Sequence, residues 1–212
     1  MHRFCALGFA MLLALRGPWA IVPPENASAQ TGTPEAGFTT PDPMDCRIEP
    51  RTVEELISFI PTGGSTPVPA AASPTPFVAP EGEPADPEAA AGVTETAEEL
   101  VACINANDFL RVFALFTDDY LQRSIAVEGM TEEGLGFLEA DLEPRSPEER
   151  DAVSVRDIRV LPDGRIGAFV IVRNPAAEGG SADFTIFVEE DDRYLIDEVV
   201  SLGPGASATP RP

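Results

Sequence analysis

The sequence predicts an α+β fold, in which helices pack on one face of a curved antiparallel sheet. Between residues 93 and 149, apolar residues recur at the three- and four-residue spacing of helices. Between residues 151 and 203, they alternate with polar residues, as they do in half-buried strands. A run of helices followed by a run of strands is typical of this fold class. We therefore expect one globular domain over residues 93–203.

Residues 1–29 are predicted to be a secretory signal peptide. His2 and Arg3 precede an apolar run over residues 4–15, and Ala-Ser-Ala at residues 27–29 fits a signal-peptidase site. The apolar run is too short to span a bilayer, so no stable membrane insertion is expected. A buried N-terminal helix is the alternative interpretation. We expect a secreted or extracytoplasmic protein whose cleavage removes its only histidine.

The composition excludes several classes of function. All 14 basic residues are arginine, so a chain without His2 has neither a histidine base nor a Schiff-base lysine. Carboxylates, Tyr120 and Tyr194 remain for acid–base chemistry. The formal net charge of −22 disfavours nucleic acid and anionic membrane surfaces as partners. The sequence contains no calcium-loop pattern, and we predict neither a metal nor a cofactor.

Three segments are predicted to lack regular structure. Residues 30–44 are rich in Thr, Pro, Gly and Ala, and we expect them to be disordered. Residues 61–92 are predicted to be a Pro/Ala-rich linker, because they carry few large apolar side chains. Residues 204–212 are predicted to be a disordered tail.

Residues 45–60 are predicted to form a short helical segment. Thr52 and Glu55 have the spacing of a capping box, and an apolar stripe follows them up to Pro61. Such a short helix needs a docking partner to be stable. Cys46 and Cys103 are the two cysteines outside the signal, and in an exported chain they predict a disulfide that would hold this segment in place. Two free buried thiols are the alternative.

The first half of the domain contains several helix signals. Thr96 with a glutamate three residues later predicts a helix start, and Asn107 with its following aspartate predicts an end and a new start. Thr117 and Thr131 each precede acidic residues and predict two further starts. Ser146 before a proline predicts a short fourth one.

The second half reads as an antiparallel meander. The apolar alternation slips near Arg156, which predicts a β-bulge at Arg156 and Asp157. Pro-Asp-Gly at residues 162–164 predicts a hairpin turn. Two further strands follow, joined by an acidic turn at residues 189–192.

Three stretches resemble the nuclear transport factor 2-like superfamily, the cone fold shared with ketosteroid isomerase and polyketide cyclase-like domains. They are LVACINANDFLRVFALFTDDYL, DIRVLPDGRIGAFVIV and FTIFVEEDDRYLIDEVVSL. The similarity covers about residues 93–203 and implies a cone with an interior pocket. We also consider a homodimer formed through the sheet.

The resemblance does not imply the isomerase reaction. Aligned from Asn105, the position of the family's phenol falls on Leu100 and that of its general base on Ser124. Leucine donates no proton, and an unassisted serine is no base near neutral pH. The third acid would lie near Asp183. Leu100, Ser124 and Tyr120 are therefore expected to be pocket or rim residues.

Asp197 is the other candidate catalytic carboxylate, beside Asp183. It shares strand parity with Leu195 and Val199, and on a buried face it would be partly removed from water. In the alternative interpretation that face is solvated. The core would then consist of Tyr194, Ile196, Val200 and Leu202.

We favour a secreted, non-catalytic cone module that binds a small apolar ligand or a protein partner. The first alternative is an isomerase, lyase or cyclase that uses Asp183 or Asp197. The second is a structural interaction domain whose pocket is filled. A cavity of several hundred Å³ with an isolated inward carboxylate would favour the enzyme, an apolar cavity would favour ligand binding, and a filled cone would favour the structural domain.

Overall fold

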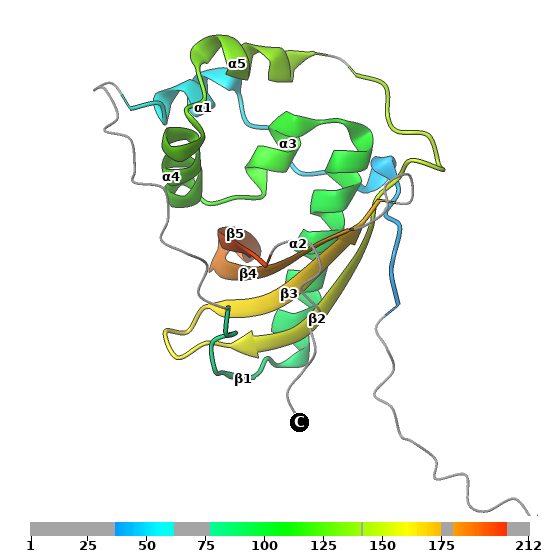
Figure 1. Cartoon of the computed structure of the whole chain (residues 1–212), viewed down its shortest axis with the longest axis vertical. Helices are drawn as coiled ribbons and strands as arrows, with labels where there is room; N and C mark the ends of the chain where they lie inside the picture. The colour runs from blue at the N-terminus through cyan, green and yellow to red at the C-terminus, as the bar shows by residue number, and fades with distance from the viewer. Residues whose placement is uncertain (1–36, 62–76, 141, 175–179, 203–212) are drawn as a thin grey trace, which may run out of the picture. The chain divides into compact units, whose positions relative to one another are not determined.

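The computed structural model describes residues 37–61, 77–140, 142–174 and 180–202, all within one compact unit that spans residues 34–212. Helices and an antiparallel sheet confirm the α+β class (Figure 1). The helical elements are η1 (Pro43–Asp45), α1 (Val53–Ser58), α2 (Pro87–Ala106), α3 (Phe109–Ala114), α4 (Asp118–Glu128), α5 (Glu132–Gly136) and η2 (Phe137–Glu139). The strands are β1 (Glu83–Pro84), β2 (Ala152–Val160), β3 (Ile166–Arg173), β4 (Gly180–Glu190) and β5 (Arg193–Ser201).

The five strands form an open, curled sheet in the order β1-β2-β3-β4-β5 (Figure 1). The predicted turn joins β2 to β3, and Gly164 has a φ of 88°, which a residue without a Cβ adopts readily. The predicted bulge in β2 is present, because the pairing with β3 shifts between Arg156 and Arg159. Asp157 sits in this bulge with a φ of 54°.

A second bulge, in β5, was not predicted. Ile186 of β4 pairs with Glu198, whereas Phe187 pairs with Ile196, so Asp197 is an extra residue in β5. Neither sequence interpretation of β5 included this break, because each assumed an unbroken alternation; Asp197 is partly removed from water, as the first expected, and Tyr194, Ile196, Val200 and Leu202 pack in apolar clusters, as the second expected. The core residues instead change parity across the bulge. Tyr194, Ile196 and Val199 pack against the α2 cluster, whereas Val200 and Leu202 pack against a separate cluster.

The main core lies between α2 and the sheet (Figure 1). Val93, Ala97 and Val101 follow one another at helical spacing and are almost fully buried. Burial of one such valine stabilises the fold by about 1.5–3 kcal/mol relative to exposure. The sheet residues of this cluster are Val153, Ile166, Ala168, Val170, Phe187 and Ile196.

The predicted start of the long helix at Thr96 is wrong. α2 begins at Pro87, where Asp86 accepts hydrogen bonds from the backbone N–H groups of Glu88 and Ala89, both at 2.9 Å. An aspartate before a proline provides both the cap and the fixed φ of a first helical turn. Thr96 is buried within α2, and its hydroxyl donates to the carbonyl oxygen of Tyr194 at 2.7 Å.

The predicted linker is also wrong over residues 77–92, since β1 and the start of α2 lie there. Phe77 packs on Phe184 with ring centroids 5.4 Å apart, and Ala79 joins the same cluster on the opposite face of the sheet from α2. These apolar contacts explain why the segment is ordered despite its prolines. Residues 62–76 of the predicted linker lie outside the described residues.

Three of the predicted helix starts in the first half of the domain are present. Asn107 ends α2 with a φ of 56°, and the carboxylate of Asp108 caps α3. The hydroxyls of Thr117 and Thr131 cap α4 and α5. The helix predicted after Ser146 is instead a turn. The residues on its two sides have other partners, because the Arg145 N–H donates to the carbonyl oxygen of Asn105 at 2.8 Å and β2 begins at Ala152.

The N-terminal segment is tied to the domain. The predicted disulfide between Cys46 and Cys103 is present, and Thr52 and Glu55 form the predicted capping box of α1. The disorder predicted for residues 30–44 is wrong for residues 37–44, because Thr39 and Val153 exchange two backbone hydrogen bonds of 2.9 and 2.8 Å. The predicted signal peptide, residues 30–36 and the predicted tail lie outside the described residues.

Candidate functional site

The corner between α3 and α4 is fixed to the free edge of β5. Residues 115–117 run beside this strand, where Ile196 N–H donates to the carbonyl oxygen of Leu115 at 2.9 Å. Thr117 N–H donates in turn to the carbonyl oxygen of Ile196 at 3.0 Å. The first turn of α4 is therefore held at the β5 bulge, and the residues of the two elements meet there.

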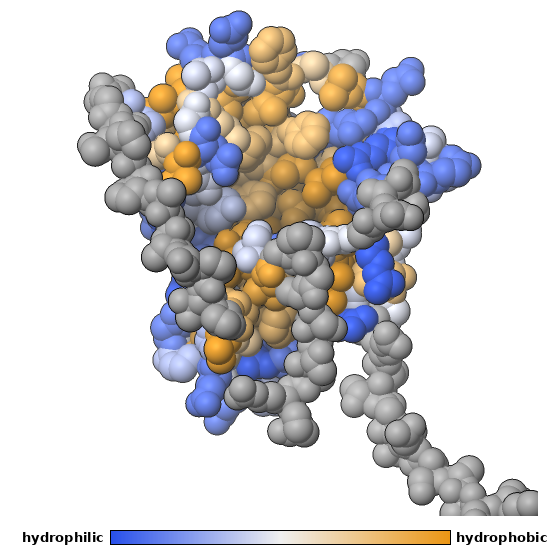
Figure 2. Space-filling view, viewed as in Figure 1, coloured by the Kyte–Doolittle hydropathy of each residue, from blue (hydrophilic) through white to orange (hydrophobic). Residues whose placement is uncertain are grey.

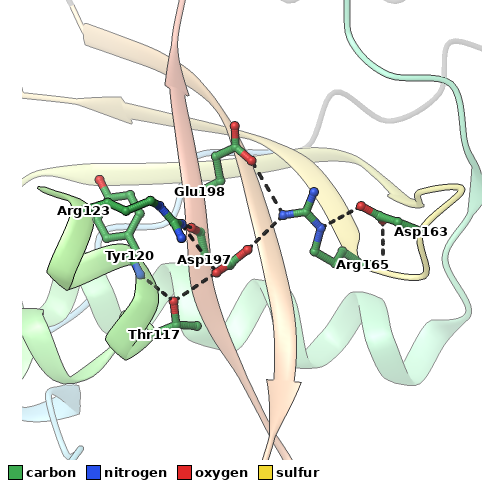
Figure 3. Close-up of polar contacts among 7 residues, drawn as sticks. All are labelled: Thr117, Tyr120, Arg123, Asp163, Arg165, Asp197 and Glu198. Atoms are coloured by element: carbon green, nitrogen blue, oxygen red, sulfur yellow. Dashed lines mark hydrogen bonds and ion pairs between the residues drawn. The ribbon is translucent and has the colours of Figure 1, made fainter. Parts of the chain in front are cut away.

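Asp197 is the centre of a polar network at this junction (Figure 3). Its Oδ1 accepts a hydrogen bond from the Thr117 hydroxyl at 3.1 Å, and its Oδ2 accepts one from Arg165 Nη1 at 2.9 Å. Arg123 Nη2 lies 3.7 Å from Oδ1 and donates to the Asp197 carbonyl oxygen at 2.8 Å. With both oxygens engaged and its side chain 18% exposed, Asp197 is an ion-paired anchor between α4, β5 and the β2–β3 turn.

Arg165 links this anchor to the β2–β3 turn. Its Nε donates to Asp163 at 2.8 Å, and its Nη1 also lies 3.6 Å from Glu198. The hydrogen bond to Asp163, followed by the one to Asp197, raises the pKa of the Arg165 guanidinium above its usual range. Arg165 is therefore a permanent cation whose charge is shared among three carboxylates.

An open pocket of about 450 Å³ lies between α4 and β5. Three of the residues selected from the sequence, Tyr120, Ser124 and Asp197, line it together. The Tyr120 ring also stacks on Phe116 with centroids 4.9 Å apart, so it forms one wall of the pocket. We call this the α4–β5 pocket, and its full lining is Tyr120, Arg123, Ser124, Val127, Glu128, Arg165, Asp197, Glu198 and Val199.

Leu100 and Asp183 are not part of the α4–β5 pocket. Leu100 packs against the α2 core and the cluster around the disulfide. Asp183 lies towards the start of β4, where it pairs with Val170 and Ser201. The two carboxylates selected from the sequence are thus placed at different positions along the sheet.

Arg123, Arg165 and Thr117 were not identified as site residues from the sequence. The sequence around Thr117 predicted its role as a helix cap. It gave no sign of the hydrogen bond from the Thr117 hydroxyl to Asp197, which lies 80 positions away. Arg165 directly follows the hairpin turn, and its contact with Asp197 depends on the β3–β4–β5 register. An arginine next to a predicted turn was the only available signal.

An apolar hollow lies over α3. This helix reads Phe-Leu-Arg-Val-Phe-Ala, and none of its six residues is buried. Leu110 and Phe113 pack against a cluster of α1, α4 and α5, and Val112 packs against the disulfide cluster. Figure 2 shows the surface hollowed between α4, α5 and the sheet, with a predominantly apolar wall where Figure 1 places α3. We call this surface the α3 hollow.

A larger groove of about 1,230 Å³ lies between the N-terminal segment, α2 and the β4–β5 turn. Nine carboxylates and two arginines line it, and both arginines are paired, Arg47 with Asp45 and Arg193 with Glu99. Partial burial, followed by the charges of Glu189, Asp86 and Glu88, raises the pKa of Tyr194 in this groove. The groove is an acidic surface in keeping with the charge of the whole chain.

No family model matches the chain, and no curated protein or solved structure matches it significantly. Within the described ranges, no group of three or more His, Cys, Asp or Glu side chains is arranged to hold a metal ion. None of the helices described is long and apolar enough to cross a membrane.

Proposed function

We propose that this domain is a non-catalytic module that binds a small apolar ligand in the α3 hollow. The observation that carries the proposal is α3 itself, an apolar helix with no buried residue beside a hollow surface (Figure 2). All six residues of α3 are partly buried, and apolar surface that stays partly open to water in a concave region often marks a binding site. Small-molecule sites are concave and mostly apolar, with a few polar groups at fixed positions.

The neighbouring pocket favours a small molecule over a protein partner. Its volume of about 450 Å³ falls within the range of about 300–1,000 Å³ that is usual for small-ligand sites. A protein partner would require a broad contact surface of about 800 Å² on each side. A protein partner remains the second candidate, and it predicts that no small apolar molecule is taken up.

The resemblance to the nuclear transport factor 2-like superfamily supports the same proposal. It implies a pocket between the helices and the sheet, and we propose that the domain is a member of that superfamily at the level of fold. In this proposal Asp197 has a structural role, because its two oxygens bond Thr117 and Arg165 and so fix α4 to β5. A homodimer through the sheet stays a prediction, to be tested by the mass of the protein in solution.

We also propose that the protein acts outside the cytoplasm. Cys46 and Cys103 are both buried and are joined in a disulfide, which persists mainly in oxidising compartments. The predicted signal peptide points to the same location. N-terminal sequencing of exported protein is expected to begin at Gln30.

Binding of an uncharged fluorescent dye, N-phenyl-1-naphthylamine, tests the proposed function. We expect saturable fluorescence enhancement that Phe113→Ser, in the part of α3 that packs towards α4 and α5, weakens by about tenfold, because about 1.4 kcal/mol of apolar contact is lost. Met44→Ser is the matched control, because Met44 is 80% exposed and lies in η1. Thermal unfolding of each variant shows whether the fold is retained.

Two results would contradict the proposal. The first is the absence of dye uptake by folded protein. The second is uptake that Met44→Ser reduces as much as Phe113→Ser does, which would show nonspecific adsorption to exposed apolar side chains.

A further inference from the structure

Building on the proposed function, we infer that the α4–β5 pocket holds the polar end of the ligand. The ligand class is an uncharged amphiphile, an apolar body that ends in a single hydroxyl or carbonyl oxygen. Its body lies against the α3 hollow, and its oxygen accepts hydrogen bonds from Tyr120, Ser124 and Arg123.

The Phe116–Tyr120 ring pair connects the two parts of this site. Phe116 follows α3 and packs against both the α2 core and the cluster of α1, α4 and α5. Its ring stacks on Tyr120, which lines the α4–β5 pocket and also packs against the cluster of α1, α4 and α5. Val199 lines the pocket and packs against the α2 core as well. An apolar body can therefore run from the pocket along the ring pair without a polar interruption.

The pocket contains hydrogen-bond donors that lack protein acceptors. Within the described part of the chain, the hydroxyls of Tyr120 and Ser124 have no protein partner. Arg123 uses Nη2 for Asp197, while its Nε and Nη1 have no acceptor there, and its side chain is 57% exposed. A ligand oxygen is an acceptor for these donors. Arg165 contributes little, because Asp163, Asp197 and Glu198 already occupy it.

The charges of the pocket favour an uncharged polar end. The pocket lining has two arginines and three carboxylates, so its formal charge is 2 − 3 = −1. These residues are Arg123, Arg165, Glu128, Asp197 and Glu198. The whole chain has a formal charge of −22, so a carboxylate ligand would be repelled on approach. An ammonium group would be attracted by the same charge and by Glu128, but it has only donors and cannot accept hydrogen bonds from Tyr120, Ser124 and Arg123. A hydroxyl or carbonyl end is not repelled by the negative charge, and its oxygen can accept the hydrogen bonds that the pocket donates.

Displacement of bound N-phenyl-1-naphthylamine by three ligands of equal chain length tests this inference. The ligands are 1-decanol, decanoate and decylamine, each below its micellar or solubility limit. We expect 1-decanol to compete most strongly, and the double substitution Arg123→Gln with Ser124→Ala to weaken its competition by about fivefold to tenfold. The affinity of the double variant for the dye is measured first, so that competition by 1-decanol is expressed relative to it.

Arg47→Gln is the control, because it makes the same charge change at a residue of the acidic groove. Stronger competition by decanoate or by decylamine would overturn the uncharged class. An unchanged affinity for 1-decanol in the double variant would overturn the assignment of the polar end. Failure of the dye itself to bind would instead refute the proposed function on which this inference rests, so the two failures are distinguishable.

Discussion

The Thr117 hydroxyl bonds Asp197 at 3.1 Å while it also accepts the Tyr120 N–H at 3.1 Å, so one side chain both caps α4 and binds α4 to the β5 bulge. The two residues lie 80 positions apart in the sequence. Their contact places Tyr120, Arg123 and Ser124 beside the sheet edge. The Thr117 hydroxyl therefore supports the geometry of the α4–β5 pocket together with the backbone hydrogen bonds between residues 115–117 and Ile196.

Thr117→Val is expected to lower the free energy of unfolding by about 2 kcal/mol, the combined cost of a lost helix cap and a lost hydrogen bond to a carboxylate. The control is Thr131→Val, because Thr131 caps α5 through Gly134 and is exposed. That variant should cost only about 1 kcal/mol. Urea unfolding monitored by circular dichroism measures both, and equal losses would show that the Asp197 bond adds nothing.

Gly92→Ala is expected to destabilise the protein, although alanine normally stabilises a helix by about 1 kcal/mol over glycine. A Cβ at Gly92 would lie 2.6 Å from Cδ2 of Tyr194, so the ring or α2 must move. In a Tyr194→Ala background, the same substitution should become stabilising. A double-mutant cycle from urea unfolding checks this, and additive effects would contradict the predicted clash.

Removal of the disulfide by Cys46→Ser with Cys103→Ser should cost about 4 kcal/mol, because the bridge closes a loop over a sequence separation of 57. The N-terminal segment should then lose its protection. Hydrogen exchange of the amides of Thr39 and Val153, which pair with each other, reports this directly. Unchanged protection of both amides would show that the remaining contacts hold the segment without the disulfide.

The Glu55 charge is expected to stabilise the protein in a pH-dependent manner. Hydrogen bonds from the Thr52 backbone N–H and then from its hydroxyl lower the pKa of Glu55 below its ordinary value of 4.5. As the pH falls, Glu55 is therefore protonated in the unfolded chain before it is protonated in the folded protein. The stability that the Glu55 charge contributes is complete above pH 4.5, the ordinary pKa, and is lost as the pH falls through the lower pKa of the folded protein.

Glu55→Gln isolates this effect, because glutamine keeps the hydrogen bonds of the capping box without the charge. The stability difference between wild type and variant should be constant from pH 6 to 8 and should vanish towards pH 3 in urea titrations. A difference that stays constant down to pH 3 would contradict the lowered pKa of Glu55.

Local signals were sufficient for much of the fold. The caps at Asp108, Thr117 and Thr131 depend on residues within three positions of each other, so their spacing is visible in the sequence. The bulge at Asp157 was also visible, because it shifts an apolar alternation within one strand. The start of α2 was misplaced because Asp86 and Pro87 follow a proline-rich stretch that masks their capping pattern.

The candidate site could be predicted only in part. Tyr120, Ser124 and Asp197 were selected, but their convergence depends on the β5 bulge, which in turn requires the register with β4 and the docking of residues 115–117. The pairing of Arg165 with Asp197 spans two strand pairings and leaves no mark on the local sequence. These long-range contacts are the features that make Asp197 the anchor of this junction.

Titration of 1-decanol into the isotopically labelled protein, followed by amide chemical shifts, tests most directly whether the α3 hollow and the α4–β5 pocket form one ligand site. Saturable shifts are expected at Phe113 and Phe116, at Tyr120 and Ser124, and at Asp197 beside the bulge. Amides of the acidic groove, such as Glu95 and Asp192, should stay unchanged. The absence of saturable shifts, or shifts confined to the acidic groove or to the sheet face beneath Phe77, would contradict ligand binding at this site.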